Sequence, residues 1–149
     1  MSLAEQKAVD VAKEMPEGTV ILGSDTVVAA DGKILGKPKS HEEAYEMIRR
    51  LAGRSHQVYT GVCLVKKGPE GEADTVVSFY DETDVNVSPM TEKEIREYAD
   101  SEEPMDKAGS YAVQGFFARY IDGLKGSYAN VMGLPVHLVY QELNKLGAL

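Results

Sequence analysis

The chain has 149 residues, of which 43% are hydrophobic and 27% charged, as in an ordinary soluble globular domain. Its formal net charge of −8 argues against nucleic acid as a partner, because such binding depends on neutralising phosphates with Lys and Arg, although a small phosphorylated ligand needs only a local cluster of donors. The absence of an apolar run of about 18 residues, and of a basic-then-apolar leader, predicts a cytoplasmic protein with no membrane partner.

The first third of the chain predicts a helix followed by a hairpin. Apolar side chains recur at helical spacing through residues 4–13. Residues 19–30 are rich in β-forming side chains, and we expect this strand to be interrupted near Gly23. Asp31-Gly32 is a strong signal for a tight hairpin turn, so residues 33–35 are expected to form the short return strand.

The middle of the chain predicts a helix and two strands. Ser40 and Glu43 have the spacing of a capping box, which predicts a helix start, and Gly53 is suited to end that helix. Residues 57–66 and 74–87 are then predicted to form two strands that pair with each other. The single cysteine, Cys63, falls within the first of these strands and is expected to be a core residue.

The last third predicts two helices separated by an irregular segment. Thr91 and Glu94 form a second capping-box pattern, and a final helix is expected from Pro135 to Leu146. Between them, residues 101–135 are glycine-rich with little periodicity, and here Asn130 is expected to hydrogen-bond the backbone. The complete order of helices and strands predicts an α/β protein with a mixed sheet.

The stretch "VILGSDTVV" sets one carboxylate, Asp25, between two apolar runs. One interpretation is a turn residue, because Gly-Ser-Asp is common in turns. The other is a carboxylate at a strand end that faces a cleft, where active sites of α/β sheets commonly lie. Local spacing does not decide between the two.

Two further motifs carry charged or amide side chains among glycines. In "ILGKP", Lys37 is either a solvated surface lysine or a cation opposing Asp25. In "EEPMDKAGSYAVQG", the residues Asp106, Lys107 and Gln114 belong either to a polar surface loop or to a loop whose free backbone N–H groups bind an anion. The three histidines show no metal-binding spacing, and neither standard nucleotide-binding glycine motif is present.

Five motifs in order carry a resemblance to a known family: "GSDTVV", "ILGKP", "LAGRSHQVYTGV", "EEPMDKAGSYAVQG" and "GSYANVMGLP". Together they resemble the Maf family of nucleoside triphosphate pyrophosphatases. That family is similar in fold to the inosine triphosphate pyrophosphatases, which implies an elongated mixed β-sheet flanked by helices with a central cleft. The implied reaction is hydrolysis of a nucleoside triphosphate to the monophosphate and pyrophosphate, assisted by Mg²⁺ or Mn²⁺.

The resemblance also implies roles for individual residues. The family's catalytic aspartate falls on Asp25 as proton acceptor, and its lysines fall on Lys7 and Lys37. Its specificity positions fall on Thr26 and Gln114, which resemble the branch acting on dTTP and UTP, or on modified pyrimidine nucleotides, rather than the 7-methyl-GTP branch. The remaining substrate-binding candidates, which come from the loop motif, are Asp106 and Lys107. No metal ligand is identified.

One departure from the family concerns the front of the chain. Family members begin with a segment like "LASxSPRR", whereas this sequence starts at "MSLAEQKAVD". We therefore expect a single Maf-like domain over residues 1–149, truncated at its N-terminus, with weaker triphosphate binding. Such a chain is expected to self-associate, for example as a homodimer, or to be less stable than a full-length relative, because uncovered sheet edges pair with other chains.

The alternative hypothesis is a non-catalytic Maf-like protein that binds a nucleotide or a protein partner. The retained charged and amide residues favour an enzyme, and the absent phosphate-gripping segment favours lost or weak activity. A third hypothesis, a nucleic-acid-binding regulator, is disfavoured by the acidic net charge.

Overall fold

The computed structural model describes residues 2–149 of the chain. The chain divides into two compact units. Unit 1 comprises Met1–Thr26, Thr60–Asp81 and Gly133–Leu149, and unit 2 comprises Val27–Tyr59 and Glu82–Met132.

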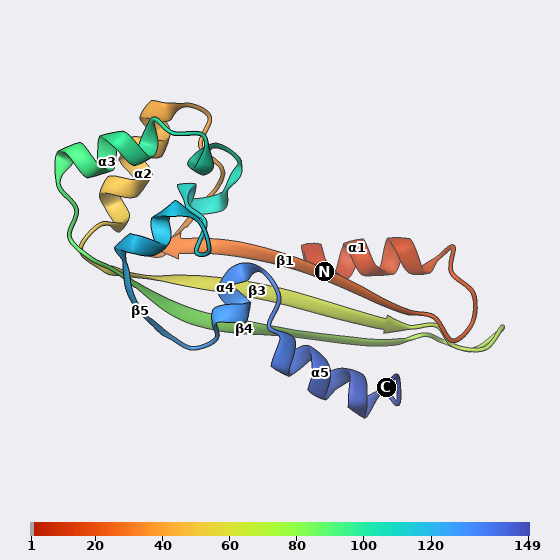
Figure 1. The fold of residues 1–149 in the computed structure, drawn as a ribbon. Helices are drawn as coiled ribbons and strands as arrows, with labels where there is room; N and C mark the ends of the chain where they lie inside the picture. The colour runs from red at the N-terminus through yellow and green to blue at the C-terminus, as the bar shows by residue number, and fades with distance from the viewer. Residues whose placement is uncertain (1) are drawn as a thin grey trace. The chain divides into compact units, whose positions relative to one another are not determined.

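Helices and strands together make an α/β fold (Figure 1). Its five-stranded sheet has the order β2-β1-β3-β4-β5, and the pairs β1–β2 and β4–β5 are antiparallel. The strands are β1 (Val20–Ala30), β2 (Lys33–Leu35), β3 (Ser55–Lys66), β4 (Thr75–Val87) and β5 (Ile121–Lys125). The helices are α1 (Leu3–Ala12), α2 (His41–Leu51), α3 (Glu92–Ala99), α4 (Tyr128–Met132) and α5 (Val136–Lys145), with short 3-10 helices η1 (Glu103–Asp106), η2 (Ala108–Ser110) and η3 (Phe116–Tyr120).

The α/β fold class is therefore confirmed. A sheet with both parallel and antiparallel strands was expected, and the pairs β1–β2 and β4–β5 are both antiparallel. Each predicted strand and long helix is present, with ends within a few residues of those expected. The elongated form and the central cleft stay predictions. Within residues 2–149, no helix combines the length and the apolar character needed to cross a bilayer.

Local start and stop signals in the sequence are confirmed by the hydrogen bonds. The Thr91 hydroxyl accepts from the Glu94 amide at 3.1 Å, and the Thr91 amide donates to the Glu94 carboxylate at 2.9 Å, which completes the capping box of α3. The Ser40 hydroxyl caps α2 by accepting from the Glu43 amide at 3.0 Å. The hairpin between β1 and β2 turns at Asp31 and Gly32, both with positive φ.

In unit 1, strands pack against helices through small and branched side chains. The buried face of α1 consists of alanines and packs with Ile21, Cys63 and Val65. A second cluster joins β3 to α5 through Val62, Leu64 and Val139. Because β3 contributes to both clusters, the residues from Val62 to Val65 are all buried, and the prediction of Cys63 as a core residue is confirmed.

The expected interruption at Gly23 is wrong, because β1 is continuous through it. A Cβ at this position would lie 2.5 Å from the carbonyl oxygen of Ala4 and 3.2 Å from the Cβ of Ala8. The glycine therefore allows α1 to approach the strand closely, and it does not break the strand.

Unit 2 has a core of aliphatic and aromatic side chains. Residues from β1, β2, β3, β4, α2, α3 and η3 all contribute to it. Its aromatic part contains Tyr98, Tyr111 and Phe117, with neighbouring ring centroids about 5 Å apart: 4.9 Å for Tyr98–Phe117 and 5.0 Å for Tyr111–Phe117. Such offset or tilted contacts are the favoured geometry for aromatic pairs.

The glycine-rich segment 101–135 is more ordered than its sequence suggests. It contains η1, η2, η3, β5 and α4, all too short for a periodic pattern to reveal. The expectation for Asn130 is confirmed: its side chain is fully buried and its amide nitrogen donates to the Val58 carbonyl at 3.2 Å and to the Thr83 hydroxyl at 2.8 Å.

His56 is the most buried titratable side chain of the unit 2 core. Its exposed fraction is 0%, and its Nε2 lies 2.7 Å from the Tyr111 hydroxyl. Its Nδ1 has no hydrogen-bond partner among the described residues. Burial lowers the pKa of His56 from 6.5 to about 4, and the nearby Arg54 adds to this effect.

We predict that His56 makes the protein less stable in mild acid. The unfolded chain binds a proton near pH 6.5 and the folded chain only near pH 4, so stability is full above the first value and falls as the pH drops toward the second. Between pH 7 and 5 the loss should be about 2 kcal/mol. Urea unfolding at both pH values should show that His56→Phe removes this part of the pH dependence and that His137→Gln, at an exposed site, retains it. Equal pH dependence in both variants would contradict the prediction.

Candidate active site

Asp25 lies in the part of β1 where no residue is fully buried. Ser24, Asp25, Thr26 and Val27 are all partly exposed, between the buried Gly23 and Val28. The Asp25 side chain is 34% exposed, so water reaches its carboxylate while the strand holds its backbone. The interpretation of Asp25 as a turn residue is therefore wrong, and so is its expected place at a strand end, because the residue is at the middle of a continuous strand.

Lys7 is the cation that unit 1 places beside Asp25. It projects from α1, and its Nζ lies 3.9 Å from Asp25 Oδ1. Because the Lys7 side chain is 53% exposed, water screens this ion pair. The pair brings together two residues that are 18 positions apart in the sequence, through the close packing of α1 on β1 at Gly23.

Thr26, the next residue on β1, points its hydroxyl toward a neighbouring strand. Its Oγ1 lies 2.9 Å from the Oγ1 of Thr60, which is fully buried in β3. Successive side chains of a strand point to opposite faces, so Thr26 lies on the other face of β1 from Asp25. The contact with Thr60 fixes the orientation of the Thr26 side chain.

Unit 2 brings three of the predicted residues into one neighbourhood. Lys107 Nζ donates to Asp106 Oδ1 at 2.7 Å. The Lys107 ammonium lowers the pKa of Asp106, and the more distant charge of Lys37 contributes to the same direction. The amide of Gly109 donates to the carbonyl of Gly36 at 3.1 Å, which ties this loop to the segment carrying Lys37.

Gln114 is exposed at a tight turn of unit 2. The amide of Gly115 donates to the carbonyl of Ala112 at 3.2 Å and closes the turn, with Val113 buried and Gln114 at the corner. The Gln114 side chain is thus presented to solvent by a turn whose preceding residue is anchored in the core.

The N–H groups of both glycines in this loop, Gly109 and Gly115, are already hydrogen-bonded within the protein. The amides of Lys107, Gly109, Ser110 and Gly115 all donate to backbone carbonyls. The amides of Phe116 and Phe117 donate to the Glu103 carboxylate. These N–H groups are used inside the protein because the loop folds into 3-10 turns, so they are not donors for an anion.

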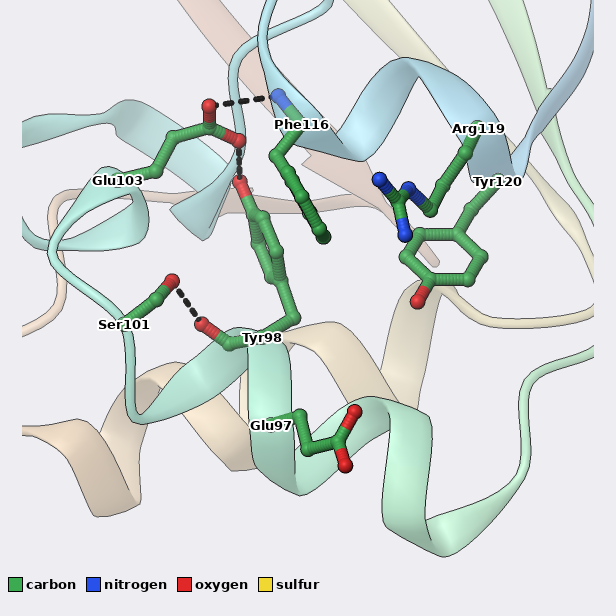
Figure 2. Close-up of a pocket in the computed structure, with 7 residues that line it drawn as sticks. All are labelled: Glu97, Tyr98, Ser101, Glu103, Phe116, Arg119 and Tyr120. Atoms are coloured by element: carbon green, nitrogen blue, oxygen red, sulfur yellow. Dashed lines mark hydrogen bonds between the residues drawn. The ribbon is translucent and has the colours of Figure 1, made fainter.

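A pocket of about 330 Å³ lies in unit 2 (Figure 2), and one of its lining residues, Phe116, follows Gln114 by two positions. Its walls come from α3, η1, η3 and the turn between α3 and η1: Glu97, Tyr98, Ser101, Glu103, Phe116, Arg119 and Tyr120. None of the residues predicted for the site lines it. The sequence did not predict a role for Glu103, although it lies in the same motif as Gln114.

No resident metal cage is found in the part of the chain that the structure describes. Within residues 2–149, no group of three or more His, Cys, Asp or Glu side chains could hold a metal ion. Mg²⁺ is usually bound through one or two carboxylates and the phosphates of a substrate.

The sequence matches known proteins over nearly its whole length. The family described as Maf-like protein matches residues 1–146. A protein of Lachnoclostridium phytofermentans named dTTP/UTP pyrophosphatase is 47% identical over 147 residues, covering 99% of this chain and 74% of that protein. A protein of Carboxydothermus hydrogenoformans with the same name is 48% identical over 147 residues, covering 99% and 76%.

The α/β fold and the partly exposed Asp25 carboxylate beside Lys7 are thus found in a chain whose residues 1–146 match the family of Maf-like proteins. The chain belongs to the Maf family.

We predict that Gly23→Ala destabilises unit 1. The new Cβ would meet the Ala4 carbonyl at 2.5 Å, so α1 must move away from β1 and carry Lys7 with it. Overpacking of this kind costs about 1–3 kcal/mol. Gly61→Ala is the matched control, because it lies on β3 with nothing within 4 Å of its added Cβ. Denaturant unfolding should show a large loss for Gly23→Ala only, and similar small losses for both would refute the packing argument.

Proposed function

We propose that this chain hydrolyses dTTP and UTP to the monophosphate and pyrophosphate. Its membership of the Maf family and its similarity to proteins named dTTP/UTP pyrophosphatase support this activity. The observation that carries the assignment is the Asp25 carboxylate, which is accessible to water on a rigid strand with the Lys7 ammonium 3.9 Å away.

Asp25 is proposed as the general base. In the reaction, a water oxygen forms a bond to phosphorus and the bond between the α and β phosphates breaks. The water proton passes to the Asp25 carboxylate, and pyrophosphate leaves. A positioned carboxylate raises the nucleophilicity of water by removing this proton as the bond forms.

The lysines are proposed to neutralise the triphosphate. The lysines are Lys7, Lys37 and Lys107, and Asp106 orients Lys107 through their hydrogen bond. A divalent cation, Mg²⁺ or Mn²⁺, is proposed to arrive with the nucleotide and to reduce the charge on its phosphates. The cytoplasmic location inferred from the sequence stays a prediction.

Thr26 and Gln114 are proposed to set the preference for the base. The Gln114 carboxamide can both donate and accept, which suits the alternating donor and acceptor groups on the imide edge of uracil or thymine. The Thr26 hydroxyl is held by Thr60 in a fixed direction. Asp25, in contrast, acts on water and the phosphates and has no part in reading the base.

We predict that Asp25→Asn lowers kcat by about 10²–10⁴-fold. Asparagine keeps the shape of the side chain and cannot accept the proton. Pyrophosphate release from dTTP and UTP with Mg²⁺ or Mn²⁺ measures the effect, with Asp10→Asn on the exposed face of α1 as the control. Unfolding curves should match for the two variants. Wild-type turnover in Asp25→Asn would rule out its role as base.

The same assay separates the enzyme from the non-catalytic alternative. A wild-type protein that binds dTTP or UTP in a titration and releases no pyrophosphate would be a nucleotide-binding relative. Turnover that depends on Asp25 would exclude that alternative.

We predict that Gln114→Glu reduces the preference for UTP over ATP, measured as the ratio of kcat/KM values, by at least about tenfold. An ionised carboxylate only accepts hydrogen bonds, so it repels the carbonyl oxygens of the pyrimidine. Gln141→Glu, at an exposed position of α5, makes the same charge change away from the turn. An unchanged UTP-to-ATP ratio in Gln114→Glu would remove this residue from the base-reading role.

A further inference from the structure

The carboxylate of Glu103 accepts three hydrogen bonds, and Figure 2 shows those from Phe116 and Tyr98. Its Oε1 accepts from the Phe116 amide at 2.7 Å. Its Oε2 accepts from the Phe117 amide at 3.2 Å and from the Tyr98 hydroxyl at 2.5 Å. Hydrogen bonds to a charged carboxylate are roughly twice as strong as those between neutral groups. Glu103 therefore links α3 and η1 to the start of η3.

The Tyr98 hydroxyl holds this carboxylate in place. The Tyr98 side chain is only 2% exposed, and its ring packs on Phe117 in the unit 2 core. Burial and the hydrogen bond to Glu103 raise the pKa of Tyr98, so its hydroxyl stays protonated and donates. The position of Glu103 is thus set by a core residue, although Glu103 itself is partly exposed.

The amides that donate to Glu103 belong to Phe116 and Phe117, two and three residues after Gln114. Val113, before Gln114, is anchored by burial, and Phe117, three residues after it, is fully buried. Phe116 is different: its side chain is 57% exposed and contacts the exposed Arg119. Packing therefore fixes Phe116 only weakly. The bond from its amide to Glu103 adds to the bond between the Gly115 amide and the Ala112 carbonyl in holding the Gln114 side of η3.

Gly115 leaves the space that the Glu103 carboxylate occupies. A Cβ on Gly115 would lie 2.0 Å from Glu103 Oε1. The φ of Gly115 is −98°, which other residues adopt, so the glycine is not required by its backbone conformation. A glycine is needed here because the Glu103 carboxylate lies where a Cβ would be.

From this geometry we propose that Glu103 is a positioning residue for base specificity: it fixes the turn that presents Gln114 and does not itself touch the nucleotide. The proposal rests on the proposed role of Gln114 in reading the pyrimidine base. Hydrogen-bond discrimination between bases requires donors and acceptors held within about 0.5 Å of the productive geometry, so a loosened turn should reduce discrimination more than it reduces turnover.

The decisive experiment measures selectivity in two backgrounds. Glu103→Gln replaces one carboxylate oxygen by an NH₂ group, which faces a donor and cannot accept from it. We expect it to lower the UTP-to-ATP ratio of kcat/KM by about tenfold. In a Gln114→Ala background the same substitution should leave the ratio unchanged, because the residue through which it acts is gone. Glu102→Gln is the matched control, since its side chain is exposed beside Glu103.

Gly115→Ala tests the inference by a second route. The added methyl group displaces the Glu103 carboxylate without changing its charge, so this variant should lose selectivity as Glu103→Gln does. Hydrogen exchange gives a readout that needs no turnover: the Phe116 and Phe117 amides should exchange faster in Glu103→Gln and Gly115→Ala than in Glu102→Gln. Binding of UMP against AMP in the same proteins repeats the selectivity comparison without catalysis.

Three outcomes would overturn the inference. The first is a normal UTP-to-ATP ratio in Glu103→Gln when Gln114→Ala has lost it, which leaves the proposed function intact. The second is an equal loss of selectivity from Glu103→Gln in both backgrounds, which would mean an effect independent of Gln114. The third is unchanged selectivity in Gln114→Ala itself, which also removes the proposed role of Gln114.

Discussion

Burial along β1 is interrupted between Gly23 and Val28, and the candidate active site depends on that interruption. In unit 1, Ile21 and Gly23 pack with α1. In unit 2, Val28 and Ala30 belong to the core. Between them, neither face is fully covered. Asp25 therefore has a backbone fixed by a continuous strand and a carboxylate that keeps its contact with water, which avoids the large cost of burying a charge.

The sequence predicted those features that depend on residues close to each other in the chain. The capping box of Thr91 and Glu94 and the hairpin at Asp31-Gly32 are of this kind, and both are present. The role of Gly23 was predicted wrongly because its cause is distant in the sequence: the glycine is required by α1, whose Ala4 lies 19 positions earlier. A glycine in a strand pattern has the same local appearance whether it breaks the strand or admits a neighbour.

The candidate site shows the same division between local and distant causes. The motifs identified Asp25, Lys37 and Gln114, and the resemblance added Lys7, but no pattern revealed that α1 would bring Lys7 to Asp25. Glycines between residues 102 and 115 suggested free amides, whereas the 3-10 turns and Glu103 use them. Glu103 was not predicted because its hydrogen-bond partners lie 5 residues before it and 13 and 14 residues after it. This spacing has no local sequence signature.

The weakness of the Lys7–Asp25 pair is consistent with a role for both residues in hydrolysis. Exposed ion pairs contribute little to stability, so Lys7 loses little free energy when its ammonium turns from the carboxylate to a phosphate. A phosphate carries more charge than Asp25 and attracts Lys7 more strongly. In the proposed reaction, Lys7 would then pair with a phosphate, and the partly exposed Asp25 carboxylate would be open to the attacking water.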